Sequence, residues 1–145
     1  MGLPRGIAER QALLLYKLGN EVLTRAEDPL AAMGLSGRQY MTLAVLDSDR
    51  PASQQELGQL CGLLPAQVVP LVDELEGRGL VERRRSEEDR RRSVVSITDS
   101  GRELLARGDA LARSIEDALF GHLEGDARAA LGDALRTALE RSRSA

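Results

Sequence analysis

One segment of this chain breaks an otherwise helical pattern, and it constrains the fold more than any other feature. Two short runs rich in aliphatic residues, Leu80–Val81 and Val94–Thr98, flank a charged stretch, Ser86–Arg92. Short β-prone runs on either side of polar residues are typical of a two-stranded hairpin with a solvent-exposed tip. Before and after this segment, apolar residues recur at the three- and four-residue intervals of amphipathic helices. We therefore expect a mainly α fold with one β-hairpin.

The helical part of the chain divides at recognisable start and stop signals. A serine followed three residues later by Gln or Glu, a capping-box pattern, predicts helix starts at Ser36 and Ser53. Gly62 ends one short helix, Pro65 suits the first position of the next, and Asp28, Pro29 and later Gly34 are expected to end the first long helix. The expected helices cover about residues 5–25, 36–47, 53–61, 65–77 and 98–120, followed by one that contains Leu131–Leu139 and by a polar tail, Arg141–Ala145.

Several classes of protein are disfavoured by what the chain contains. Cys61 and His122 are each the single residue of their type, so an internal disulfide, a cysteine zinc site and a catalytic triad have no basis. We therefore expect no enzyme and no cofactor. The sequence has neither the apolar run of a signal peptide nor the ~20 apolar residues that span a bilayer, which predicts a cytoplasmic protein without a membrane partner.

Charge is concentrated around the expected hairpin. The segment Arg78–Arg92 contains seven arginines and four acidic residues, whereas the whole chain has a formal net charge of −3. Affinity for nucleic acid comes largely from Lys and Arg placed against phosphates. A cationic segment on an acidic body can bind DNA locally. A solvated charge run is the alternative interpretation.

A short helix, a turn, a second helix and a charged hairpin follow one another in the order of a winged helix-turn-helix. From about Ser36 to Leu105 the sequence resembles the MarR family of bacterial regulators. The motifs that carry the resemblance are Ser53–Leu57, Leu71–Glu76, Gly79–Arg83 and Asp89–Arg91 followed by Val95, Ile97, Thr98 and Gly101.

This resemblance implies a homodimer that binds a pseudo-palindromic operator in double-stranded DNA and acts as a repressor released by a small aromatic effector. The implied division is an N-terminal dimerisation helix, a winged DNA-binding domain and C-terminal dimerisation helices, at residues 1–35, 36–100 and 101–145, within one compact unit. The apolar stripes of the terminal helices would pack on a partner, although a monomer's core is the alternative.

The resemblance also implies roles for individual residues. Arg91 occupies the position of a wing arginine that enters the minor groove, while Asp89 would pair with a neighbouring arginine and, with Arg83, shape the wing. Tyr16 and Tyr40 are candidates for lining the effector pocket. The expected DNA contacts are Ser53, Gln54, Ala66, Gln67, Val69, Pro70, Arg90, Arg91 and Arg92.

The expected DNA-reading helix has an unusual outward face. Gln67 could pair bidentately with adenine and Val69 could touch a thymine methyl, whereas Asp73 should lie away from phosphate. Pro70 removes one intrahelical hydrogen bond and costs on the order of 3 kcal/mol inside a helix, so a kink is expected there. Pro70 and Asp73 motivate an alternative function, a winged-helix protein-interaction module with reduced DNA specificity.

Two further residues allow a plain and a functional interpretation. Cys61 is either a small apolar core residue or a redox sensor, and the first is favoured because it lies in the turn region. His122 is either an ordinary helix-end residue or a group that binds ligand or titrates between dimer helices.

Overall fold

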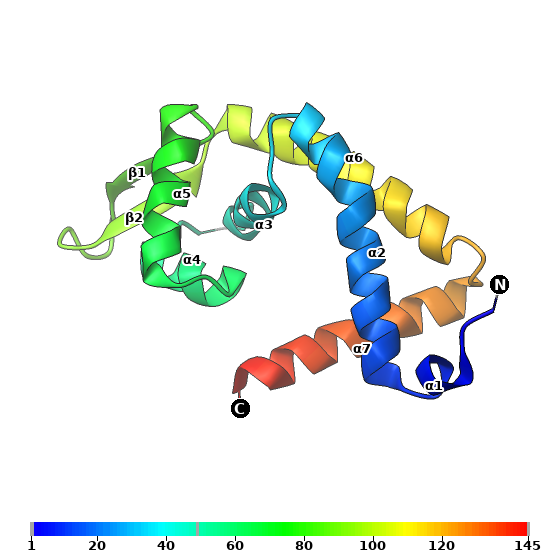
Figure 1. Ribbon diagram of the computed structural model, residues 1–145. Coiled ribbons are helices and arrows are strands. Elements are labelled where there is room, and N and C mark those ends of the chain that lie inside the picture. Colours follow the sequence, from blue (N-terminus) through cyan, green and yellow to red (C-terminus); the bar gives the residue numbers. More distant parts are fainter. Residues whose placement is uncertain (1, 49, 145) are drawn as a thin grey trace. The chain divides into compact units, whose positions relative to one another are not determined.

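The computed structural model describes residues 2–48 and 50–144. Its elements follow the predicted order of helices interrupted by one antiparallel hairpin (Figure 1). This confirms the mainly α winged fold. The elements are α1 (Arg5–Ala8), α2 (Gln11–Ala32), α3 (Gly37–Leu46), α4 (Gln54–Cys61), α5 (Pro65–Gly77), β1 (Val81–Arg85), β2 (Ser93–Ile97), α6 (Asp99–Phe120) and α7 (Gly125–Ser144).

The chain divides into two compact units, Met1–Leu111 and Ala112–Ala145. Within the smaller unit, Ile115 is buried and Arg128 of α7 donates to Asp117 of α6 at 2.8 Å. The larger unit contains α1 to α5, the hairpin and the first half of α6. No helix among the described residues is long and apolar enough to cross a membrane.

The core of the larger unit draws on segments from both sides of the expected DNA-binding domain. Leu43, Val72 and Val95, from α3, α5 and β2, are completely buried. Leu30 of α2 and Leu105 of α6 belong to the same cluster of buried residues. The predicted boundaries at residues 36 and 101 therefore do not separate hydrophobic cores, because the ends of the flanking helices help to build this one.

The hairpin extends the core as a short sheet. Val81 pairs with Ile97 and Arg85 with Ser93 in antiparallel register. Ala52, just before α4, adds a bridge on the other side of β2, with N–H···O distances of 3.0 and 2.7 Å to Val95. The base of the wing is thereby joined to the start of α4.

The predicted helix-start signals are confirmed. Ser36 and Ser53 each accept a hydrogen bond from the backbone N–H three residues later, and the side chains at those later positions bond back to the serines. Gly62 ends α4 with a left-handed φ of 65°, a conformation that favours glycine. Pro65 is the first residue of α5, as expected.

Other helix boundaries differ from the expectation. The first expected helix is split into α1 and α2, and α2 continues through Pro29 to Ala32. The lost N–H of Pro29 is tolerated because burial of the adjacent Leu30 anchors this last turn. The expected polar tail is also helical, since α7 reaches Ser144; Arg141 and Arg143 in its last turn interact favourably with the helix dipole.

Candidate DNA-binding surface

Helices α4 and α5 form a tight helix-turn-helix. A Cβ on Gly58 of α4 would lie 3.2 Å from both the Leu63 carbonyl oxygen and the Val68 side chain. This close approach explains the need for a very small residue there. Val68, Val72 and Leu75 of α5 are buried, so the opposite face of α5 is presented to solvent.

That outward face is aliphatic in its N-terminal half and acidic in its C-terminal half. Ala66, Val69, Pro70 and Asp73 are all exposed, as the helical periodicity predicts. Leu64 in the turn is 68% exposed and Val69 is 44% exposed. Helix α5 runs without interruption past Pro70, although this residue cannot donate to the Ala66 carbonyl. Sequence reasoning missed Leu64, whose place directly before the first helical residue was the available signal.

Three of the expected DNA contacts are already engaged within the protein. Gln67 accepts a hydrogen bond from the Leu64 N–H at 3.0 Å, so bidentate pairing with adenine would require that contact to break. The Ser53 hydroxyl accepts from the Glu56 N–H at 3.2 Å. Gln54 accepts from Arg83 Nε at 3.0 Å. Gln67 and Ser53 therefore cap helices, and Gln54 joins α4 to β1 of the wing.

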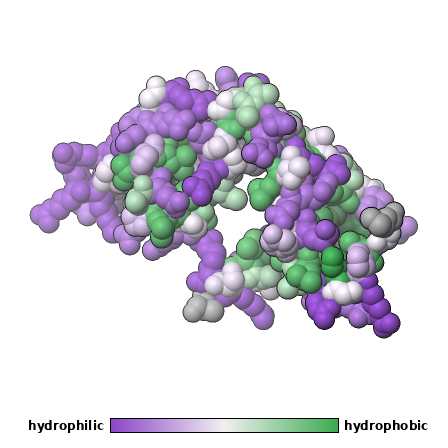
Figure 2. Space-filling view, viewed as in Figure 1, coloured by the Kyte–Doolittle hydropathy of each residue, from purple (hydrophilic) through white to green (hydrophobic). Residues whose placement is uncertain are grey.

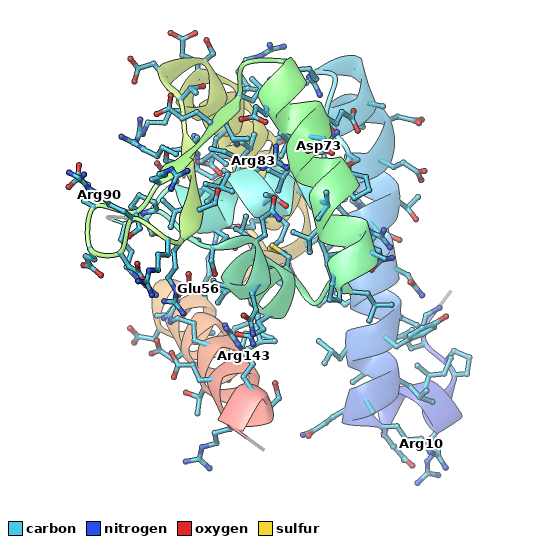
Figure 3. All side chains as sticks on the ribbon, turned by 90° about the vertical axis from the view of Figure 1, so that its left-hand side faces the viewer. Arg10, Glu56, Asp73, Arg83, Arg90 and Arg143 are labelled. Atoms are coloured by element: carbon cyan, nitrogen blue, oxygen red, sulfur yellow. The ribbon has the colours of Figure 1, made fainter. Side chains whose placement is uncertain are left out.

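Arg83 connects the wing to the DNA-reading helix. Its guanidinium lies 2.5 Å from Asp73 Oδ1 (Figure 3). It also bonds to Glu76, and the Arg83 backbone N–H donates to Glu76 at 3.1 Å. Partial burial lowers the pKa of Arg83, but the bonds to Asp73 and Glu76 outweigh it and hold the pKa above its ordinary value. Asp73, which was expected to lie away from phosphate, is thus paired within the protein and shares the positive charge of Arg83 with Glu76.

The wing tip presents a concentration of positive charge. Arg90, Arg91 and Arg92 are exposed and form no ion pair within residues 2–48 and 50–144. Hydrophilic residues cover the wing in the space-filling view (Figure 2). A concavity of about 370 Å³ on the wing is lined by Ser93 and the six arginines 83–85 and 90–92.

The loop geometry differs in one detail from the expectation. Asp89 accepts a hydrogen bond from the Arg91 backbone N–H at 3.0 Å, where pairing with an arginine side chain was expected. Among the described residues Asp89 has no ion pair. The Arg85 side chain bonds to the backbone of the same loop, because it donates to the Arg90 carbonyl oxygen at 3.0 Å. Asp89 therefore shapes the loop through the backbone, because the short carboxylate reaches the nearby N–H in a turn.

A separate apolar cavity of about 690 Å³ lies along α2, the start of α3 and the end of α4. Neither Tyr16 nor Tyr40 is among its lining residues, whereas Tyr16 lines a separate shallow groove along α2. Tyr16 is 68% exposed on α2. Tyr40 donates to Asp109 at 2.8 Å and its ring packs against Gly108. The charged residues at the cavity are Glu27 and Arg38.

Cys61 also lines this cavity. Burial raises the pKa of the Cys61 thiol, and a contact with the Thr42 hydroxyl only partly opposes this. A raised pKa lowers the thiolate fraction on which oxidation depends. This favours the structural interpretation of Cys61. His122 is exposed in the loop between α6 and α7.

These features define a class of protein, the winged helix-turn-helix proteins. Within that class, a profile of the MarR family matches residues 33–92. The transcriptional repressor NicR of Pseudomonas putida is 32% identical over 142 residues, which cover 98% of this chain and 90% of the relative. The chain belongs to the MarR family of transcription regulators.

Other similar proteins and solved structures support this family assignment. The regulator SarZ of Staphylococcus epidermidis is 26% identical over 68% of this chain, and the match spans just under two thirds of that relative's length, 66%. CouR from Rhodococcus jostii RHA1 bound to p-coumaroyl-CoA has a TM-score of 0.81 and 29% identity, with 92% and 94% of the two chains covered. CouR bound to a 23-mer DNA duplex has a TM-score of 0.79 and 33% identity, with coverage of 96% and 99%.

Proposed function

We propose that this protein represses transcription by binding a pseudo-palindromic operator as a homodimer. Helix α5 enters the major groove and the wing arginines reach the adjacent minor groove, where the negative potential is strongest when the groove is narrow. The observation that carries the proposal is the exposed Arg90–Arg92 tip beside a helix-turn-helix. The DNA-bound structure of CouR, 33% identical to this chain, supports it.

Exposed apolar residues on the terminal helices support the homodimer. On α2, Leu15 is 59% exposed and Leu23 is 65% exposed; on α7, Leu139 is 65% exposed. Leu15 and Leu23 border a shallow apolar groove along α2 that is also lined by Val22 and Tyr16. Because burial of such surface is favourable, α2 and α7 suit packing against the same helices of a second copy.

The cavity along α2, α3 and α4 suits the effector. Its lining is largely aliphatic, including Leu30, Leu35 and Met41, with Arg38 at the start of α3. A flat apolar molecule that carries a carboxylate or another anionic group would match this combination. The ligand-bound CouR structure supports an aromatic effector.

Release from DNA is then a population shift. An effector that binds better to one arrangement of α2 relative to α3 and α4 favours that arrangement. The two α5 helices of a dimer must match half-sites about one helical turn, roughly 34 Å, apart. An arrangement with a different spacing therefore binds the operator less well.

The test is a titration of the protein against the DNA upstream of its own gene, at several salt concentrations and against an unrelated duplex of equal length. Preferential binding with a steep salt dependence is expected, because phosphate contacts release counterions. Equal, weak binding to both duplexes would contradict the proposal and support the protein-interaction alternative.

A further inference from the structure

We propose that α5 selects its DNA sites by contact with thymine 5-methyl groups. The contacting surface is the aliphatic strip, which we define as Leu64, Ala66, Val69 and Pro70. The inference rests on the proposed function and adds the chemical feature that the protein reads in the major groove.

The aliphatic strip is exposed to solvent on the helix-turn-helix. Leu64 and Val69 are 68% and 44% exposed, and Ala66 and Pro70 are exposed beside them. Adjacent apolar side chains on a surface mark a place where a partner removes water. The same unit carries the cationic wing, so the partner expected at this strip is a polyanion that also offers apolar groups.

Helix α5 has few ways to read bases by hydrogen bonds. It contains no Arg, Lys, Asn, Ser or Thr, the residue types that most often bond to base edges. The carbonyl oxygen of Gln67 caps the helix, and Asp73 and Glu76 are held by Arg83. Glu74 lies between Asp73 and Glu76 in the C-terminal half of α5, while the residues that contact bases lie near the N-terminal end of a recognition helix.

The major groove presents one apolar group, the 5-methyl of thymine, and small aliphatic side chains pack against it. A cytosine at the same position leaves an N4 amino donor against Val69 or Ala66 without an acceptor. Such an unsatisfied polar group costs binding free energy. The strip therefore favours thymine by attraction and disfavours cytosine by desolvation, while phosphate contacts of the wing supply attraction that is independent of sequence.

The experiment starts from the tightest-binding duplex selected from a randomised pool. Each thymine of that duplex is replaced in turn by uracil, which lacks only the methyl group and keeps every hydrogen-bonding group. We expect Kd to rise about fourfold for each contacted methyl. Uracil placed outside the half-sites should leave Kd unchanged.

A variant of the protein locates the contact. Val69→Ala removes two methyl groups from an exposed position, so the fold should be retained, and Leu3→Ala is the control at an exposed aliphatic residue on the N-terminal segment. With Val69→Ala, the penalty for uracil should shrink at the thymine that faces Val69 and persist elsewhere. Leu3→Ala should leave every penalty unchanged.

The outcomes separate the inference from the function on which it rests. If the selected duplex binds specifically and uracil has no effect at any position, the methyl readout is overturned and operator binding stands. If Val69→Ala leaves all uracil penalties unchanged, Val69 is not the contact and the inference is also overturned. If the pool yields no preferred sequence, the proposed function itself fails.

Discussion

Arg83 of β1 holds Asp73 of α5 with a guanidinium–carboxylate distance of 2.5 Å. The same guanidinium bonds to Glu76 of α5 and to Gln54 of α4. One half-buried arginine therefore joins both helices of the helix-turn-helix to the wing. It also offsets part of the repulsion that these two acidic side chains on α5 would exert on DNA phosphates.

Replacement of Arg83 by Met should destabilise the fold and weaken DNA binding. We expect the free energy of unfolding to fall by about 1–2 kcal/mol. This is the usual contribution of a charged hydrogen bond, reduced because the two carboxylates are partly exposed to solvent. Urea denaturation measures this loss, and Arg102→Met is the control because its ion pairs are long, at 3.5 and 3.7 Å, and exposed. Equal effects of the two variants would contradict the connecting role of Arg83.

Removal of charge at the wing tip should change the salt dependence of DNA binding. Arg91→Ala should reduce the slope of log K against log salt by about one, the loss of one phosphate contact. Arg5→Ala removes the same charge from α1, far from the wing in sequence, and should leave the slope unchanged. An unaltered slope for Arg91→Ala would leave Arg91 as a solvated residue with no DNA contact.

Gly108 should resist substitution because Tyr40 occupies the space beside it. A Cβ at position 108 would lie 2.6 Å from the Tyr40 ring. Gly108→Ala should therefore lower the free energy of unfolding by about 1–3 kcal/mol through overpacking, despite the better helix propensity of alanine. Gly132→Ala in α7 is the control, since the nearest atom is the end of a flexible arginine at 3.5 Å; it should be neutral or stabilising by up to about 1 kcal/mol. Thermal or urea unfolding of both variants distinguishes these outcomes.

Glu56 should contribute to a loss of stability in acid. Its backbone and side-chain hydrogen bonds with Ser53, together with Arg50, lower the pKa of the Glu56 carboxyl in the folded protein. A lowered folded-state pKa means that this stability is present above the unfolded-state pKa and is lost as pH falls through the folded-state pKa. Urea midpoints measured from pH 7 down to pH 3 should fall less steeply for Glu56→Gln than for the unaltered protein. The exposed Glu103→Gln on α6 is the control, and a Glu56→Gln profile as steep as the original would exclude this contribution.

Contacts between near neighbours in the chain were predictable. Ser36 with Gln39 and Ser53 with Glu56 form capping boxes because three-residue spacing brings these groups together whatever surrounds them. The buried and exposed faces of α5 followed from helical periodicity in the same way. The charged hairpin was predictable because its tip needs no partner other than water.

Contacts between distant residues were not predictable from patterns. Tyr40 was expected to line an effector pocket, and no local pattern predicted its hydrogen bond to Asp109, 69 residues later. The expected stop at Pro29 failed because the adjacent Leu30 is anchored in a core that other segments supply. Gln54 was expected to face DNA, yet it binds Arg83, 29 residues away.

The sequence by itself determined the mainly α winged fold, the helix caps and the cationic wing, because these depend on local spacing and on solvation of charge. Only the tertiary structure decided how those parts are joined. It placed Arg83 against Asp73 and Glu76, and so offset part of the negative charge at the C-terminal end of an acidic helix. The reason is physical: the free energy of an ion pair depends on distance and burial, which only the packed chain sets.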